Sequence, residues 1–130
     1  LADRGIRTNV TTICSAAQAL LALNTGASIV CCYIGRVADR GEDPLRTVED
    51  VANWIARGGY RTELMAASIR TPEQAVDVAR AGATILTLPL RVIETMYAHQ
   101  VGSEAVARFE ADWRARPGAV DEETKRLLLR

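Results

Sequence analysis

Lysine is almost absent from this sequence, and that absence limits the chemistry that the chain can carry. Lys125 is the only lysine among the 16 basic residues, so all the others are arginine. Lysine forms Schiff bases, whereas the planar guanidinium of arginine suits phosphate and carboxylate groups. A Schiff-base mechanism confined to this chain would therefore have to use Lys125.

Several further features are missing. No apolar run reaches the roughly 20 residues that a membrane helix needs, and no basic segment followed by an apolar one indicates a signal peptide. The 16 acidic residues balance the 16 basic ones, which favours neither a nucleic-acid nor a membrane surface. The three cysteines match no zinc spacing or disulfide framework. We therefore expect a cytoplasmic protein with reduced thiols, no metal, and neither a nucleic-acid nor a membrane partner.

What the sequence does contain is a strand–helix unit repeated four times. Each strand follows shortly after a glycine, which suits the left-handed residue that ends a preceding helix. These glycines are Gly5, Gly26, Gly59 and Gly82. The predicted strands, rich in β-branched and small apolar residues, are Thr8–Ile13, Ile29–Ile34, Thr62–Ser68 and Thr84–Leu88.

Helix start signals follow the strands. Ser15 caps a helix that runs to about Leu23, and Asp43 precedes an amphipathic helix over Pro44–Arg57. Thr71-Pro72-Glu73-Gln74 combines an N-cap, a proline in the first turn and a glutamine that would close a capping box. The remaining predicted helices are Pro89 to about His99, Ser103 to about Arg116, and a short one from Asp121 through Leu129.

Apolar strands alternating with one-faced helices indicate a parallel sheet covered by helices. The sheet is either doubly wound or part of a (β/α)8 TIM barrel, and a doubly wound binding module would need a glycine-rich phosphate loop, which the sequence lacks. Because four units make half a barrel, and because Leu1–Gly5 resembles the last turn of a helix, we expect further sequence upstream. We expect residues 1–116 to form this half-barrel and 117–130 a helical tail.

Polar residues at the carboxyl ends of the strands are the candidates for chemistry, because barrels place their active sites there. Arg36, Ser68 and Arg70 would converge as a phosphate clamp. Structural alternatives remain open for these positions. Arg36 could instead pair with Asp39 or Glu42 in its loop, and His99 suits a helix cap or the surface better than a catalytic base. Asn9, Thr11 and Tyr33 could be hydrogen-bonded structural residues.

Six stretches carry a resemblance to a known family, in order and with natural spacing. They are Gly5–Thr12 with Ser15–Ala19, Tyr33–Arg36, Ala66–Arg70, Ala81–Thr84, Leu86–Pro89 and Phe109–Trp113. In these stretches the chain resembles the small transaldolase and fructose-6-phosphate aldolase family. The resemblance implies a class I aldolase-type barrel with these strands as strands five to eight, no cofactor, and a Schiff-base lysine upstream of Leu1. Lys125 lies outside every matching stretch.

The resemblance also implies residue roles. Asn9 would hydrogen-bond the dihydroxyacetone end of the substrate, and Thr11 would hold the water that relays protons. Cys31 would lie beside the C1 hydroxyl, at a position where the family usually has serine or alanine. The substrate phosphate would bind to Arg36, Ser68 and Arg70.

Three functions stay open. The first is transaldolase-type transfer of a dihydroxyacetone unit between sugar phosphates, which Asn9-Val10-Thr11 and Gly35-Arg36 favour because they resemble the transaldolase branch of the family more closely. Another is fructose-6-phosphate aldolase activity, which Tyr33 favours because a phenol there could protonate the carbanion and release free dihydroxyacetone. The third is a non-enzymatic, phosphate-binding half-barrel. Because the family forms rings in which the C-terminal helix packs on a neighbour, the resemblance implies a homo-oligomer through the face of Val106, Phe109 and Trp113. An intramolecular clasp over the barrel is the alternative for this face.

Overall fold

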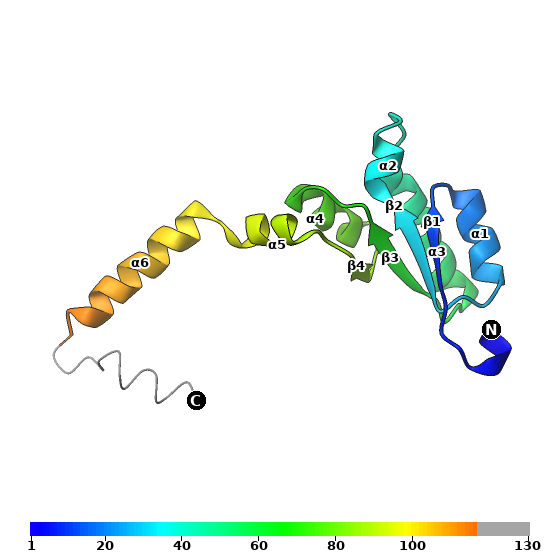
Figure 1. The fold of residues 1–130 in the computed structure, drawn as a ribbon, viewed down its shortest axis with the longest axis horizontal. Helices are drawn as coiled ribbons and strands as arrows, with labels where there is room; N and C mark the ends of the chain where they lie inside the picture. Colours follow the sequence, from blue (N-terminus) through cyan, green and yellow to red (C-terminus); the bar gives the residue numbers. More distant parts are fainter. Residues whose placement is uncertain (117–130) are drawn as a thin grey trace. The chain divides into compact units, whose positions relative to one another are not determined.

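The first unit of the chain is an α/β fold built on a parallel sheet. A computed structural model describes residues 1–116, and the chain divides into a unit over Leu1–Glu94 and a second one that begins at Thr95. All neighbouring strands of the first unit are parallel, in the order β1-β2-β3-β4, and Figure 1 shows the arrows of β1, β2 and β3 pointing the same way. The strands are β1 (Asn9–Ile13), β2 (Ile29–Tyr33), β3 (Glu63–Ala67) and β4 (Ile85–Leu86).

Helices separate successive strands, which confirms the predicted repeat. The chain opens with a 3-10 turn, η1, at Ala2–Arg4, followed by Gly5 at φ +70°. Gly26, Gly59 and Gly82 also have positive φ, as their places before the strands predict. The helices are α1 (Ala16–Asn24), α2 (Ile34–Ala38), α3 (Pro44–Gly58), α4 (Pro72–Arg80), α5 (Leu90–Tyr97) and α6 (Gln100–Arg114).

The predicted helix caps are present, with one change of partner. The side chains of Ser15, Asp43 and Thr71 accept hydrogen bonds from backbone N–H groups in the first turns of α1, α3 and α4. Gln74, however, accepts from the N–H of Arg70, one residue before the cap, at 2.8 Å. Gln18 in α1 accepts from Cys14 in the same way, also at 2.8 Å. Each glutamine side chain thus connects the loop that follows a strand to the next helix.

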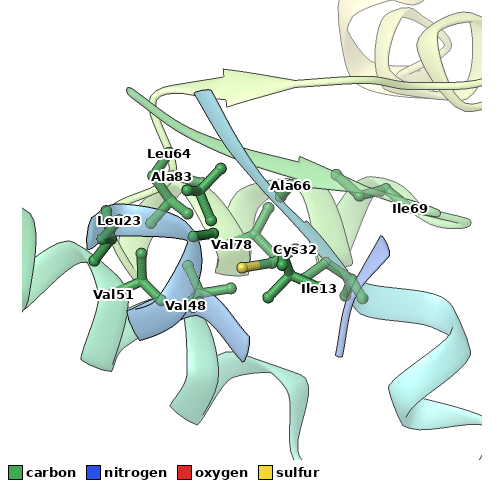
Figure 2. Packing of buried hydrophobic residues seen from close by; sticks show 14 of the residues in the cluster. Ile13, Leu23, Cys32, Val48, Val51, Leu64, Ala66, Ile69, Val78 and Ala83 are labelled. Carbon is green, nitrogen blue, oxygen red and sulfur yellow. The ribbon is translucent and has the colours of Figure 1, made fainter. Parts of the chain in front are cut away.

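One face of the sheet is buried under the helices. Val30, Cys32, Leu64 and Ala66 from the strands share a core with residues of α1, α3 and α4, and Figure 2 shows several of these side chains gathered between strands and helices. The helix residues are Ala19, Ala22 and Leu23 of α1, Val48 and Val51 of α3, and Ala75 and Val78 of α4. Because all three helices cover the same face, this arrangement favours part of a barrel over a doubly wound sheet, whose helices cover both faces.

A bulge in β1 sets which side chains reach the core. Val10 pairs with Val30 but Ile13 pairs with Cys32, so β1 carries one extra residue between these pairs. Strict alternation from Asn9 would place Ile13 on the same face as Asn9. The bulge turns Ile13 into the core, where it is buried, and Thr12 adopts φ +65° at the bulge.

The strands and helices differ from prediction at a few boundaries. Ile34 and Ser68 lie outside the strands predicted to contain them: Ile34 begins α2, and Ser68 has a left-handed backbone at φ +61°. β4 is only Ile85–Leu86, although the N–H groups of Thr84 and Thr87 continue the bonding to β3. Helix α2 was not predicted, because five residues containing a glycine show no helical periodicity.

The second unit contains α6, which begins three residues before the predicted Ser103. His99 stands at its N-cap without a capping bond from its side chain, so the surface interpretation of His99 holds. Val106, Phe109 and Trp113 are exposed on one face, as predicted, and line a shallow hollow with Glu110. Residues 117–130, which include the predicted Asp121 helix and Lys125, lie outside the described residues. Within the described part of the chain, no helix is long and apolar enough to cross a membrane.

The buried face predicts a large and position-specific effect of truncation. Leu64 in β3 is 2% exposed, whereas Leu21 on α1 is 72% exposed. Leu64→Ala removes methyl groups from a packed core and should lower the free energy of unfolding by about 3 kcal/mol. Leu21→Ala, the matched control, should change it by less than about 0.5 kcal/mol. Urea denaturation measures both, and equal effects would contradict the assignment of the core face.

Candidate functional site

A backbone hydrogen bond joins the segments that follow β2 and β3 at the carboxyl edge of the sheet. The backbone N–H of Gly35, in the first turn of α2, donates to the carbonyl oxygen of Ser68 at 3.0 Å. A Cβ on residue 35 would lie 2.4 Å from that oxygen and 2.8 Å from Nε of Arg70. The guanidinium of Arg70 therefore rests against the Gly35 backbone, and only glycine leaves room for both contacts.

This junction brings together the three residues of the predicted phosphate clamp. Arg36 directly follows Gly35 in α2, Ser68 directly follows β3, and Arg70 lies two residues beyond Ser68. We call Arg36, Ser68 and Arg70 the anion group. Their chain segments meet at the Gly35–Ser68 hydrogen bond. Binding of phosphate by their side chains stays a prediction.

Two residues at the carboxyl edge hold a strained backbone. Thr12 has φ +65° and Ser68 has φ +61°, a left-handed conformation that side chains other than glycine rarely adopt. A β-branched residue such as Thr12 is especially uncommon there. Such positions cluster at functional sites, where surrounding bonds hold the strained form. Here the Ser68 carbonyl is held by Gly35, and Cys14 Sγ donates to the Thr12 carbonyl at 3.6 Å.

Arg70 is paired with an acidic residue for which the sequence predicted a different partner. Its two terminal nitrogens donate to the two carboxylate oxygens of Asp39, the residue that ends α2. The hydrogen bonds from Arg70 have the largest effect and lower the pKa of Asp39. Desolvation opposes them, and the charges of Arg70 and Arg36 lower the pKa further. The alternative prediction had paired Asp39 with Arg36. The ion pair in the structure is with Arg70, because the loop after β3 lies against α2.

A cavity of about 690 Å³ opens beside this ion pair. Its lining carries charges of both signs, from Arg36, Arg40, Asp39 and Glu42, together with Cys14 and Val37. The side chain of Arg36 is exposed, and within residues 1–116 the ion pairs found do not include it. The cavity therefore offers an arginine with free donors next to one that is already paired.

The remaining predicted residues lie on the face of the sheet that the helices leave open. Asn9 and Thr11 are exposed there, and Asn9 Nδ2 donates to Met65 Sδ at 3.7 Å. Cys31, two residues before Tyr33 on β2, is hydrogen-bonded to the side chain of Thr11. Asn9, Thr11, Cys31 and half-buried Tyr33 thus share one face, as strand alternation predicts for Asn9 with Thr11 and for Cys31 with Tyr33.

Strand alternation also predicts that Leu64, Ala66 and Ser68 share one face, which the structure shows only for the first two. Leu64 and Ala66 do share a face, but it is the buried one. Ser68 joins neither face regularly because β3 ends at Ala67 and the backbone turns left-handed. Its place at the site comes from that turn.

The contacts of Gly35 and Asp39 with Arg70 were not predicted from the sequence. Gly35 was quoted only as part of a motif, and nothing local in Tyr33–Arg36 reveals that a guanidinium lies against it. Asp39 was noted for its closeness in sequence to Arg36, whereas its partner is 31 residues away. No group of three His, Cys, Asp or Glu side chains in residues 1–116 is placed to hold a metal ion.

A family model described as Transaldolase/Fructose-6-phosphate aldolase matches residues 1–129. The chain belongs to the transaldolase/fructose-6-phosphate aldolase family. The resemblance seen in the sequence is thereby confirmed.

Curated relatives in this family carry the name of one of its two activities. A "Probable transaldolase" of Kosmotoga olearia is 42% identical over 113 residues, covering 87% of this chain and 52% of the relative. A "Probable transaldolase" of Exiguobacterium sp. is 48% identical over 111 residues, covering 85% of this chain and 51% of the relative. The chain therefore spans about half the length of the curated relatives that it matches.

Solved structures show a similar fold without close sequence. A crystal structure of a mandelate oxidase variant with 2-hydroxy-phenylacetamide superposes with a TM-score of 0.50 at 14% identity, covering 64% of this chain and 25% of that one. This likeness concerns the fold alone.

The three cysteines of this transaldolase-family chain should differ sharply in reactivity. Burial raises the pKa of Cys31, and burial with the neighbouring thiols raises the pKa of Cys32 to about 12. A raised pKa leaves little thiolate, the reactive form, at pH 8. Cys14 is half-buried at the cavity and free of a disulfide. A thiol titration with a disulfide reagent should find one rapidly reacting group in the folded chain, absent from Cys14→Ser; rapid reaction of Cys32 would contradict the buried assignment.

Proposed function

We propose that this chain supplies the phosphate-binding and proton-relay half of a transaldolase. In this proposal the protein transfers a dihydroxyacetone unit between sugar phosphates, and its sheet is part of a (β/α)8 barrel. Family membership and the transaldolase names of the relatives support it. The observation that carries it is the Gly35 junction, which joins the loop after β3 to α2 at the carboxyl edge of a parallel sheet.

The anion group suits the phosphate of a sugar substrate. Arginine presents several N–H donors in a plane, and bonds from a guanidinium to phosphate are charge-assisted. Ser68 adds a neutral hydroxyl beside them. A phosphate held here fixes one end of an extended sugar, so that its reacting carbons lie over the open face of the sheet. That face carries Asn9 and Thr11.

The covalent step requires a lysine, and we infer that it comes from polypeptide outside this chain. An imine between that lysine and C2 of fructose 6-phosphate accepts the electron pair released when the C3–C4 bond breaks. Glyceraldehyde 3-phosphate leaves, and the dihydroxyacetone carbon then attacks the carbonyl carbon of an acceptor aldose phosphate. A proton removed from the C4 hydroxyl is returned to the oxygen of the new alcohol. Water finally hydrolyses the imine.

The open-face residues have distinct parts in this scheme. The Asn9 amide, held near Met65, would hydrogen-bond the dihydroxyacetone hydroxyls. Thr11 would hold the water that moves protons. Cys31, whose thiol pKa is raised by burial, would contact the C1 hydroxyl as a neutral group.

The exposed face of α6 suits an interface between copies of the protein. Phe109 and Trp113 are large and aromatic, and they line one hollow with Val106. Exposed aromatic clusters of this kind are typical of interfaces. We therefore infer a homo-oligomer formed through this helix.

Borohydride trapping tests the proposed reaction. The longer gene product that carries this chain, incubated with fructose 6-phosphate and borohydride, should gain one dihydroxyacetone adduct on a lysine outside residues 1–130. Reduction makes the imine permanent, so peptide mass spectrometry locates it. The 130-residue chain should stay unlabelled, and Lys125→Arg in the longer protein should leave labelling unchanged. Labelling of Lys125 would overturn the proposal, and absence of any adduct would favour a non-enzymatic phosphate-binding protein.

Fructose-6-phosphate aldolase activity is the second candidate, favoured by the position of Tyr33. This tyrosine ends β2, half-buried, on the same face as Cys31 and directly before the Gly35 junction. A phenol there can give a proton to the carbanion and release dihydroxyacetone. The same incubation without an acceptor distinguishes the activities. A transaldolase holds the unit after one turnover, whereas an aldolase releases free dihydroxyacetone continuously.

A further inference from the structure

The two arginines of the anion group stand in different electrostatic surroundings. Both terminal nitrogens of Arg70 donate hydrogen bonds to the carboxylate of Asp39. Arg36 lines the cavity, and within the described residues the ion pairs found do not include it. One of the two positive charges is therefore balanced before any ligand arrives.

The position of Arg70 does not rest on Asp39 alone. The backbone N–H of Arg70 donates to Gln74 Oε1 at 2.8 Å. Its guanidinium rests against the backbone of Gly35, where the space for a Cβ is filled by Arg70 Nε. Loss of the Asp39 charge would thus leave Arg70 close to its present place.

Asp39 is fixed at the cavity by its own helix. Its backbone N–H donates to the Gly35 carbonyl at 3.0 Å, and its side chain lines the cavity beside Arg36. Arg70 lowers the pKa of the Asp39 carboxyl, with Arg36 contributing, so the carboxylate stays charged at neutral pH. An anion in the cavity meets this negative charge at close range.

We propose that Asp39 limits phosphate affinity: by neutralising Arg70, it weakens the binding of phosphate to the anion group. The proposal rests on the proposed function, since it assigns a limit to the phosphate affinity of that same site. Arg36 then supplies the uncompensated charge that attracts phosphate. Arg70 offers only the N–H groups that Asp39 leaves free.

A limited affinity for phosphate suits a transfer reaction. Every sugar phosphate in the cycle carries the same phosphate, so affinity for that group stabilises substrate, intermediate and product alike. Uniform binding of this kind does not lower the chemical barrier. Excess affinity would instead delay the release of each phosphorylated product.

The test is a titration of the 130-residue chain with inorganic phosphate at low salt, followed through backbone amide shifts near Gly35. Asp39→Asn keeps the side-chain shape but removes the charge, and it should tighten phosphate binding about five-fold, the effect of one unit charge about 4 Å away in water. Asp39→Glu retains the charge and should bind like the unmodified chain. Amide spectra of both variants outside the cavity report whether the fold is kept.

Glu42→Gln is the matched control, because Glu42 lines the same cavity but is not paired with Arg70. It removes an equal charge and should tighten binding by clearly less than Asp39→Asn. Equal effects of the two variants, unchanged or weaker binding by Asp39→Asn, or no phosphate binding by the unmodified chain would each overturn the role of Asp39. Borohydride trapping is independent of all these outcomes, so failure of the proposed reaction is recognised separately.

Discussion

The rest of the site depends on one constraint, the hydrogen bond from the Gly35 N–H to the Ser68 carbonyl. The absence of a side chain on Gly35 also leaves the space that Arg70 occupies. A parallel sheet brings neighbouring strand ends to one edge, but it leaves their loops free to separate. Here the loop after β3 is tied to the first turn of α2. Ser68 accepts a left-handed backbone to make that tie. The result is that the chain segments carrying Arg36, Ser68 and Arg70 meet at the ends of two adjacent strands.

The two faces of the sheet differ: one packs against the helices, and the other carries the polar side chains to which we assign the chemistry. The face under α1, α3 and α4 is apolar and closely packed, and it fixes the strand register. The open face carries the Asn9 amide, the Thr11 hydroxyl and the Cys31 thiol. The bulge at Thr12 makes this division possible in β1, because it sends Ile13 into the core while Thr11 stays on the open face. Strain at Thr12 is thus offset by burial of Ile13.

Much of the fold follows from local signals in the sequence. Glycines before each strand, the caps Ser15, Asp43 and Thr71, and the stripe of α3 each act within a few residues, so a pattern reveals them. The bulge, α2 and the true partner of Asp39 could not be found in this way. Each depends on contacts between segments distant in sequence, as the 31 residues between Asp39 and Arg70 illustrate. The anion group could be predicted because barrel geometry indicates where strand ends meet, although it does not indicate which side chain neutralises which.

Family membership and geometry together lead to one central claim: the segments joined at Gly35 form a phosphate site. The chain covers about half the length of its curated relatives, and the claim concerns residues wholly within it. A crystal structure of the chain grown with inorganic phosphate tests it most directly. The account predicts a phosphate within hydrogen-bonding distance of the Arg36 guanidinium and the Ser68 hydroxyl, with Asp39 still paired to Arg70. Phosphate bound at another part of the chain, with this cavity left to solvent, would contradict it.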